Sequence, residues 1–158
     1  MKKTIALVCA ALCLLLTACG GNSGSQSDTP ARPFQASDVT SILASNAFSE
    51  ELEELDADLV CTLYGLDEAM ITGCTAHLST GASAEEVVLF TVGDEANVQA
   101  VRTACEKRVA DQAKAYASYL PGEVTKLDKA ILEVRGTTVL LVVANDAAAA
   151  RAAIDALV

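Results

Sequence analysis

The sequence KAILEVRGTTVLLVVA, residues 129–144, decides the fold. Two apolar runs, 129–135 and 138–144, flank Gly136, and both are rich in the β-branched and aliphatic residues that favour strands. Two such runs with a short glycine-containing loop between them predict a tight β-hairpin. The second run is apolar at successive positions, which is typical of a strand buried on both faces. Something must therefore cover each face of the sheet.

A second hairpin is predicted upstream, from strands at 71–80 and 86–92 around a turn at 81–84. Strand residues alternate between the two faces of a sheet. In the first of these strands, one face carries Cys74, Ala76 and Leu78, and the other carries Ile71, Thr75 and His77. The second strand, EVVLFTV, is again apolar on both faces.

Helices are predicted before, between and after the hairpins. Ser37 and Asp38 begin the first, with an apolar face of Val39, Ile42 and Leu43. Ser49 begins a second, SEELEELDADLV, because it is followed at helical spacing by Leu52, Leu55 and Leu59.

The longest predicted helix runs from Glu95, capped by Asp94, to about Leu120, where Pro121 and Gly122 end it. Its apolar stripe consists of Val98, Val101, Cys105, Val109, Tyr116 and Leu120. A final alanine-rich helix follows a cap at Asp146 and contains Ile154 and Leu157.

These elements predict an α+β fold: a four-stranded antiparallel sheet made of two hairpins, with the long helix packed across it and further helices at the N- and C-terminal ends. The second face of the sheet could be covered by the N-terminal helices, by the C-terminal helix or by a partner chain.

The first residues have the pattern of an export signal. Lys2 and Lys3 precede an apolar run at 5–16, and small residues follow. The run is too short to cross a bilayer, which takes roughly 20 residues. Leu16, Thr17, Ala18 and Cys19 resemble the lipobox of bacterial lipoproteins. The resemblance implies a diacylglyceryl group on the Cys19 sulfur and cleavage after Ala18, and two acyl chains hold a protein stably on a membrane.

The chain therefore divides into a lipoprotein signal peptide (1–18), a lipidated cysteine with a flexible tether (19–35) and a single α+β domain (36–158). The tether is inferred from glycine, serine and proline without hydrophobic periodicity. We expect the extracytoplasmic face of the cell membrane as the location.

The net charge of −10 argues against nucleic acid as a partner, because binding to phosphates needs a lysine- and arginine-rich surface. The charge is uneven, since no lysine or arginine occurs between Pro33 and Val101.

Several stretches occur in a characteristic order along the chain: FSEELEELD (48–56), LYGLD (63–67), SAEEVVLF (83–90), Arg108, Gln112, YLPGE (119–123) and AILEVRGTTVLLVV (130–143). This ordered set resembles a family of small Gram-positive bacterial lipoproteins, the domain of unknown function 4358. The resemblance implies a surface lipoprotein with an α+β domain. It implies no activity and no catalytic residues.

Three cysteines outside the signal, Cys61, Cys74 and Cys105, form no C-x-x-C pair, which argues against thioredoxin-like redox chemistry. Two alternatives stay open: buried reduced thiols, or a disulfide between two of the three. His77 and Cys74 should point to opposite faces of their strand, which does not suit a Cys–His nucleophile.

The densest acidic run lacks the spacing of a calcium loop and is interpreted as a solvated face; it contains Glu50, Glu51, Glu53, Glu54, Asp56 and Asp58. Glu85 and Glu86 are a candidate carboxylate pair only if they share a pocket. Neither a metal site nor a cofactor is expected.

No nucleophile-elbow, P-loop, Rossmann or zinc-protease motif occurs, so we do not expect an enzyme. The favoured hypothesis is a membrane-anchored, non-catalytic module that binds another membrane or envelope protein. The alternative is a surface module that binds a small ligand or a cation.

Overall fold

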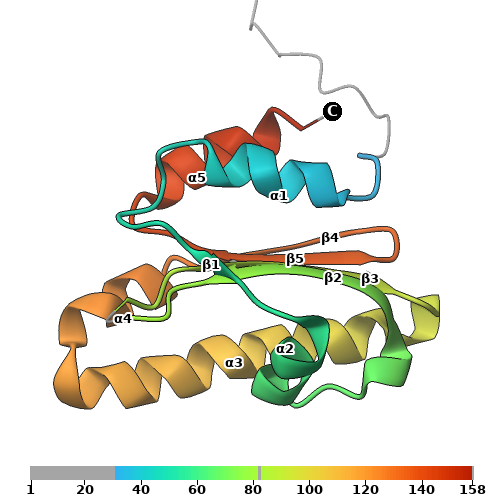
Figure 1. The fold of residues 1–158 in the computed structure, drawn as a ribbon, viewed down its shortest axis with the longest axis horizontal. Helices are drawn as coiled ribbons and strands as arrows, with labels where there is room; N and C mark the ends of the chain where they lie inside the picture. The colour runs from blue at the N-terminus through green and yellow to red at the C-terminus, as the bar shows by residue number, and fades with distance from the viewer. Residues whose placement is uncertain (1–30, 82, 158) are drawn as a thin grey trace, which may run out of the picture.

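A computed structural model describes residues 31–81 and 83–157. It has three layers, with one antiparallel sheet between two layers of helices (Figure 1). The strands are β1 (Glu53–Glu54), β2 (Ile71–Leu78), β3 (Glu86–Val92), β4 (Ile131–Arg135) and β5 (Thr138–Val143), in the order β1-β2-β3-β5-β4. The α+β class and all four predicted strands are confirmed. β1 is an additional fifth strand at one edge.

Helices on both faces explain why the central strands are apolar at successive positions. α2 (Ala57–Tyr64), α3 (Val98–Tyr119) and α4 (Pro121–Leu127) cover one face, and α1 (Ala36–Leu43) and α5 (Ala147–Asp155) cover the other (Figure 1). The terminal helices of the chain itself therefore cover the second face. Among the described residues no helix is both long and apolar enough to cross a membrane.

The two cores follow the alternation of the strands. In β3, Val88, Phe90 and Val92 pack toward α3, whereas Val87 and Leu89 pack toward α1 and α5. β5 divides its side chains in the same way: Val139, Leu141 and Val143 face α3, and Leu140 and Val142 face the other layer.

The long helix α3 confirms its predicted stripe. Val101, Cys105 and Tyr116 are buried against the sheet, and Val98, Val109 and Leu120 pack at the margin. A 3₁₀ turn at Glu95–Asn97, capped by Asp94, precedes it.

One predicted face is wrong. Ile71 packs in the same core as Cys74, because an irregularity between Ile71 and Gly73 shifts the register of β2 against β3. A bulge of this kind moves the residues before it to the opposite face.

The helix predicted to begin at Ser49 is also wrong over its first part, since α2 begins at Ala57 and the residues before it include β1. Leu52 packs in the α1–α5 core and Leu55 in the α3 core. Because residues three apart share one face of a helix, a helical segment could not send these two leucines to opposite sides of the sheet.

Pro121 ends α3, as predicted, but it also begins α4, where a proline at the first helical position is well tolerated. α4 was not predicted, and it supplies two charged side chains to the interior described below.

Candidate functional site

Two consecutive carboxylates at the head of β3 are almost completely buried. Glu85 and Glu86 are each 1% exposed. Their hydrogen bonds lead to separate sets of partners, so they do not form the carboxylate pair considered from the sequence.

Glu85 lies in a closed network between three parts of the chain. Lys126 Nζ of α4 is 2.7 Å from Glu85 Oε1 and 3.1 Å from Glu123 Oε2. The Ser49 backbone N–H donates to Glu85 Oε2 at 2.8 Å, and the Ser49 hydroxyl donates to Oε1. Burial acts to raise the pKa of Glu85, but the hydrogen bonds from Lys126 and Ser49 outweigh it and lower that pKa. These hydrogen bonds connect the loop that contains Ser49 and the helix α4 to the start of β3 through the Glu85 carboxylate.

Glu86 lies on the α3 side beneath Arg108. Arg108 Nη2 is 3.3 Å from Glu86 Oε2. The Gln112 amide fits between them, with its nitrogen 3.2 Å from Glu86 Oε1 and its oxygen 2.8 Å from Arg108 Nη2 in the orientation that satisfies both. Burial raises the pKa of Glu86, and the nearby Arg108 offsets only part of that effect.

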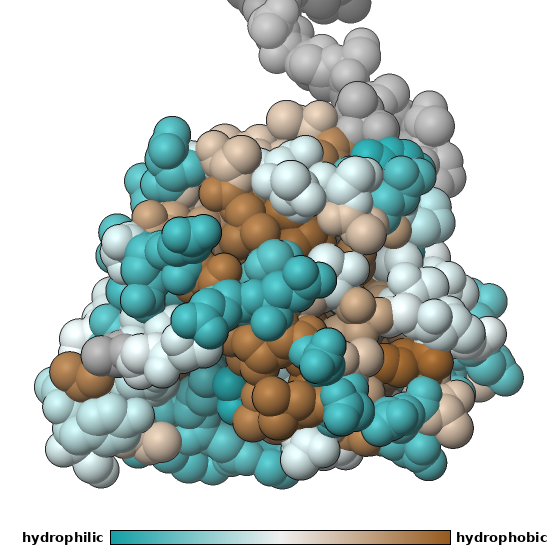
Figure 2. Space-filling model, in the orientation of Figure 1, coloured by the Kyte–Doolittle hydropathy of each residue, from teal (hydrophilic) through white to brown (hydrophobic). Residues whose placement is uncertain are grey.

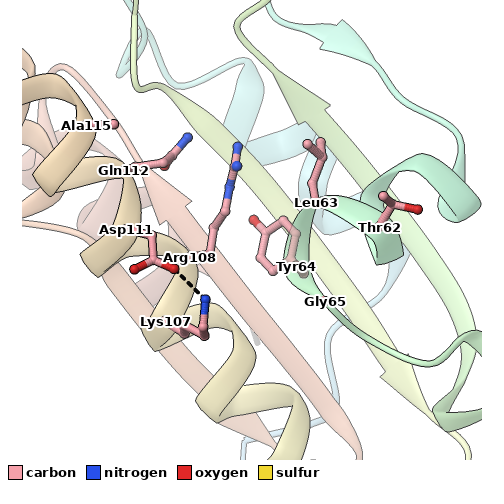
Figure 3. Close-up of a pocket in the computed structure, with 9 residues that line it drawn as sticks. All are labelled: Thr62, Leu63, Tyr64, Gly65, Lys107, Arg108, Asp111, Gln112 and Ala115. Carbon is pink, nitrogen blue, oxygen red and sulfur yellow. Dashed lines mark hydrogen bonds and ion pairs between the residues drawn. The ribbon is translucent and has the colours of Figure 1, made fainter. Parts of the chain in front are cut away.

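A pocket of about 450 Å³ opens above this cluster, between α2 and α3. We call it the α2–α3 pocket; its lining residues are Thr62, Leu63, Tyr64, Gly65, Lys107, Arg108, Asp111, Gln112 and Ala115 (Figure 3). Arg108 and Gln112 are four residues apart on α3 and so project from the same side of the helix. α2 ends at Tyr64 and is capped by Gly65, whose φ of +65° is the left-handed conformation that favours glycine at a helix C-terminus.

Tyr64 forms the inner wall on the α2 side. Its ring meets Phe90 edge-on at 5.2 Å, and the Arg108 guanidinium lies 5.5 Å from the ring centre. The hydroxyl points toward Arg108 (Figure 3) but makes no hydrogen bond of normal geometry within the described residues. Burial and the neighbouring Glu86 carboxylate raise the pKa of Tyr64 far above its usual range, so the hydroxyl keeps its proton.

The charged residues that line the pocket are paired. Lys107 and Arg108 are cationic, and Asp111 is the one lining carboxylate; its oxygen lies 2.5 Å from Lys107 Nζ. The α2 wall has no charged residue. Arg108 is paired in turn with the Glu86 carboxylate beneath it, so each cation of the lining has a carboxylate partner.

Hydrophobic side chains on α2 continue the outer wall of the pocket. Leu63 is 40% exposed and Leu59 is 48% exposed. The space-filling view shows hydrophobic surface over α2 (Figure 2).

The remaining predicted residues do not join this site. The six acidic residues from Glu50 to Asp58 are exposed, as predicted, and no group of three or more metal-ligating side chains occurs in the described part of the chain. His77 is half-buried on β2 opposite Val87. The lipobox residues Leu16 to Cys19 lie outside the described residues.

Cys61, Cys74 and Cys105 are free thiols, and the first and last are buried. Burial raises the pKa of Cys61, and it raises the pKa of Cys74 and of Cys105 to about 12, so none is an activated nucleophile. All three thiols are reduced in this structure, although Cys74 is half-buried rather than buried. A disulfide between two of them under oxidising conditions stays a prediction.

The sequence did not identify Tyr64, Arg108, Gln112 and Glu86 as one site. Arg108 and Gln112 were noted only within the family resemblance. Their i, i+4 spacing was the available signal, because it places an arginine and an amide side by side on one helix face.

A comparison with protein families finds one match, the domain of unknown function (DUF4358), over residues 45–144. The chain belongs to the DUF4358 family. The match covers all five strands and the whole α2–α3 pocket. No curated protein and no solved structure matches the DUF4358 chain.

Proposed function

We propose that this DUF4358 protein is a bacterial lipoprotein anchored through Cys19 on the extracytoplasmic face of the cell membrane. We further propose that its domain is a non-catalytic module whose binding site is the α2–α3 pocket. The anchor is supported by the sequence LTAC at 16–19 after a basic and apolar leader. The binding role is supported chiefly by the polar floor of a pocket of about 450 Å³, a size typical of small-ligand sites.

The ionisable groups at the pocket favour holding a ligand over transforming one. The raised pKa of Tyr64 makes its hydroxyl a weak acid. Lys107 lowers the pKa of Asp111, which makes that carboxylate a weak base. Glu86 is sealed beneath Arg108 and Gln112, where it orients the guanidinium.

Two kinds of partner remain, and each has an observation in its favour. The pocket favours a small ligand. Exposed Leu59 and Leu63 favour a protein partner that packs on α2. The absence of clustered metal ligands in the described residues leaves a cation without a visible site.

The anchor is tested by comparing the full-length wild type with Cys19→Ala in the producing bacterium. The wild type should incorporate an alkyne-tagged fatty acid and sediment with membranes, while the variant should lose both the label and the sedimentation. A variant that stays labelled and membrane-bound would contradict the anchor.

The binding role is tested by thermal shift of the full chain in detergent against the small-molecule fraction of a cell extract. Ala115→Phe should narrow the pocket, and Ala117→Phe adds the same ring to an exposed position of α3 outside it. A ligand raises the melting temperature of the state that binds it. We expect a rise for the wild type and Ala117→Phe only. No rise, or an equal rise in all three proteins, would contradict a ligand site in the pocket.

A further inference from the structure

The unsatisfied buried polar atoms of the described residues concentrate at one place. Three side-chain atoms lack a hydrogen bond of normal geometry: the Tyr64 hydroxyl, Arg108 Nε and Arg151 Nε. The last has a carboxylate oxygen of Asp155 at 3.0 Å. The other two belong to neighbouring side chains of the α2–α3 pocket. Because a buried polar group without a partner destabilises the fold, two adjacent ones suggest a role in binding.

Both of these groups are hydrogen-bond donors. Glu86 and Gln112 both accept hydrogen bonds from the Arg108 guanidinium at Nη2. Its Nε and Nη1 groups therefore have donating capacity left, since arginine carries five N–H donors. The Tyr64 hydroxyl adds one more. A ligand that satisfies all of them must offer acceptor oxygens.

Charge narrows the class of acceptor. The lining has two cations, and each is already paired: Lys107 with Asp111, and Arg108 with the buried Glu86. The pocket therefore has little excess positive charge. A carboxylate is a monoanion with two acceptor oxygens and matches a guanidinium well. A phosphate monoester carries up to two negative charges and three strong acceptor oxygens, for which this lining has too few cationic groups.

The apolar residues that line the α2–α3 pocket favour a ligand with an apolar body. Leu63 and Ala115 flank the polar floor, and the Tyr64 ring provides a flat surface. An aromatic acid or a branched aliphatic acid fits a volume of about 450 Å³ and can place its apolar body against these side chains.

We propose that the α2–α3 pocket binds a small organic carboxylate, whose oxygens accept hydrogen bonds from the Arg108 guanidinium and the Tyr64 hydroxyl while its apolar body lies against Leu63 and Ala115. The inference rests on the proposed binding role of this pocket and names the chemical class that it recognises.

The test is ligand-observed ¹⁹F NMR with the full chain in detergent. The probe is 4-fluorobenzoate, and 4-fluorobenzyl alcohol is its uncharged match of nearly equal size. We expect saturable binding of the acid to wild type and at least about tenfold weaker binding of the alcohol, because it cannot form a charge-assisted hydrogen bond.

Two substitutions locate the binding. Arg108→Gln removes the charge and should weaken binding of the acid about tenfold or more. Tyr64→Phe removes only the hydroxyl oxygen and should weaken it about three- to tenfold. Arg102→Gln is the matched control, because Arg102 is an exposed, ion-paired residue of the same helix outside the pocket. The Arg102→Gln protein should bind the acid with the same affinity as wild type. Tyr64→Phe keeps the test decisive if Arg108→Gln does not fold.

The outcomes separate this inference from the proposed function. Equal binding of acid and alcohol, both abolished by Ala115→Phe, would overturn carboxylate recognition and leave the pocket as a binding site. Binding of the acid unchanged by Tyr64→Phe and Arg108→Gln would also overturn it. Binding of neither probe would overturn it as well, and the proposed function would then depend on the thermal-shift comparison with cell extract.

Discussion

Two tyrosines of this protein should respond in opposite directions to the same substitution. Tyr64 is 4% exposed, and its hydroxyl lies near the Glu86 carboxylate but makes no hydrogen bond of normal geometry within the described residues. Tyr116 is also buried, but its hydroxyl donates to the Ser83 carbonyl at 2.8 Å. Replacing either by phenylalanine keeps the ring and removes one oxygen, so the change in stability reports on the hydroxyl alone.

The magnitudes follow from the hydrogen-bond inventory. An unpartnered buried polar group costs about 1–3 kcal/mol, so Tyr64→Phe should stabilise the fold by about 1 kcal/mol. Tyr116→Phe removes a hydrogen bond and leaves a carbonyl less satisfied, so it should destabilise the fold by about 1–2 kcal/mol. For a domain of this size, each kcal/mol corresponds to a shift of about 4 °C in melting temperature.

The assay is urea denaturation of both variants and wild type, followed by circular dichroism, with the free energy of unfolding obtained by linear extrapolation. The variants should lie on opposite sides of wild type. If Tyr64→Phe destabilises the protein as much as Tyr116→Phe does, the Tyr64 hydroxyl has a partner in the folded protein, and the argument from unsatisfied donors at the pocket is refuted.

Three further predictions concern other buried groups. Lys126→Met leaves Glu85 buried without its cation and should cost roughly 3 kcal/mol at pH 7, whereas Lys114→Met on the surface of α3 should change the unfolding free energy little. The pKa of Glu85 is lower in the folded than in the unfolded protein, so Glu85 stabilises wild type above its unfolded pKa, and this stabilisation is lost as the pH falls through the folded pKa. The free-energy cost of Lys126→Met should therefore become smaller in acid. Denaturation curves at several pH values measure this cost. The pKa of folded Glu86 is raised instead, so wild type should lose stability as the pH rises from the unfolded pKa through that raised value, and Glu86→Gln should lack this slope in the same pH series. Cys61, Cys74 and Cys105 should react with iodoacetamide far more slowly in the folded protein than in urea, as peptide mass spectrometry would measure; rapid native labelling of any of them would contradict their raised pKa values.

The sequence predicted those strands and helices whose hydrophobic pattern is contained within one continuous stretch of residues. The strands 86–92 and 138–143 were visible because every position after Glu86 in the first and every position in the second is apolar or β-branched. α3 was visible because its apolar stripe repeats over many turns. β1 was missed because Leu52 and Leu55 have helical spacing, and only the sheet shows that they enter different cores.

The candidate site depends on three elements that are distant in the chain. Tyr64 comes from α2, Glu86 from β3 and Arg108 from α3. A sequence shows each as an ordinary buried or charged residue, because the missing hydrogen-bond partners and the pocket exist only once the elements pack. Pro121 and Gly122 have the pattern of a helix end and do end α3. The same pattern predicts a loop after α3, so the short helix α4 that begins at Pro121 was missed.

The most direct test of the pocket is native mass spectrometry of the full chain released gently from its own membranes. We expect wild type and Ala117→Phe to carry a small molecule that is lost on denaturation, and Ala115→Phe to carry none. A bound mass equally present on Ala115→Phe, or absent from all three proteins, would contradict the claim that the α2–α3 pocket is where this protein binds its ligand.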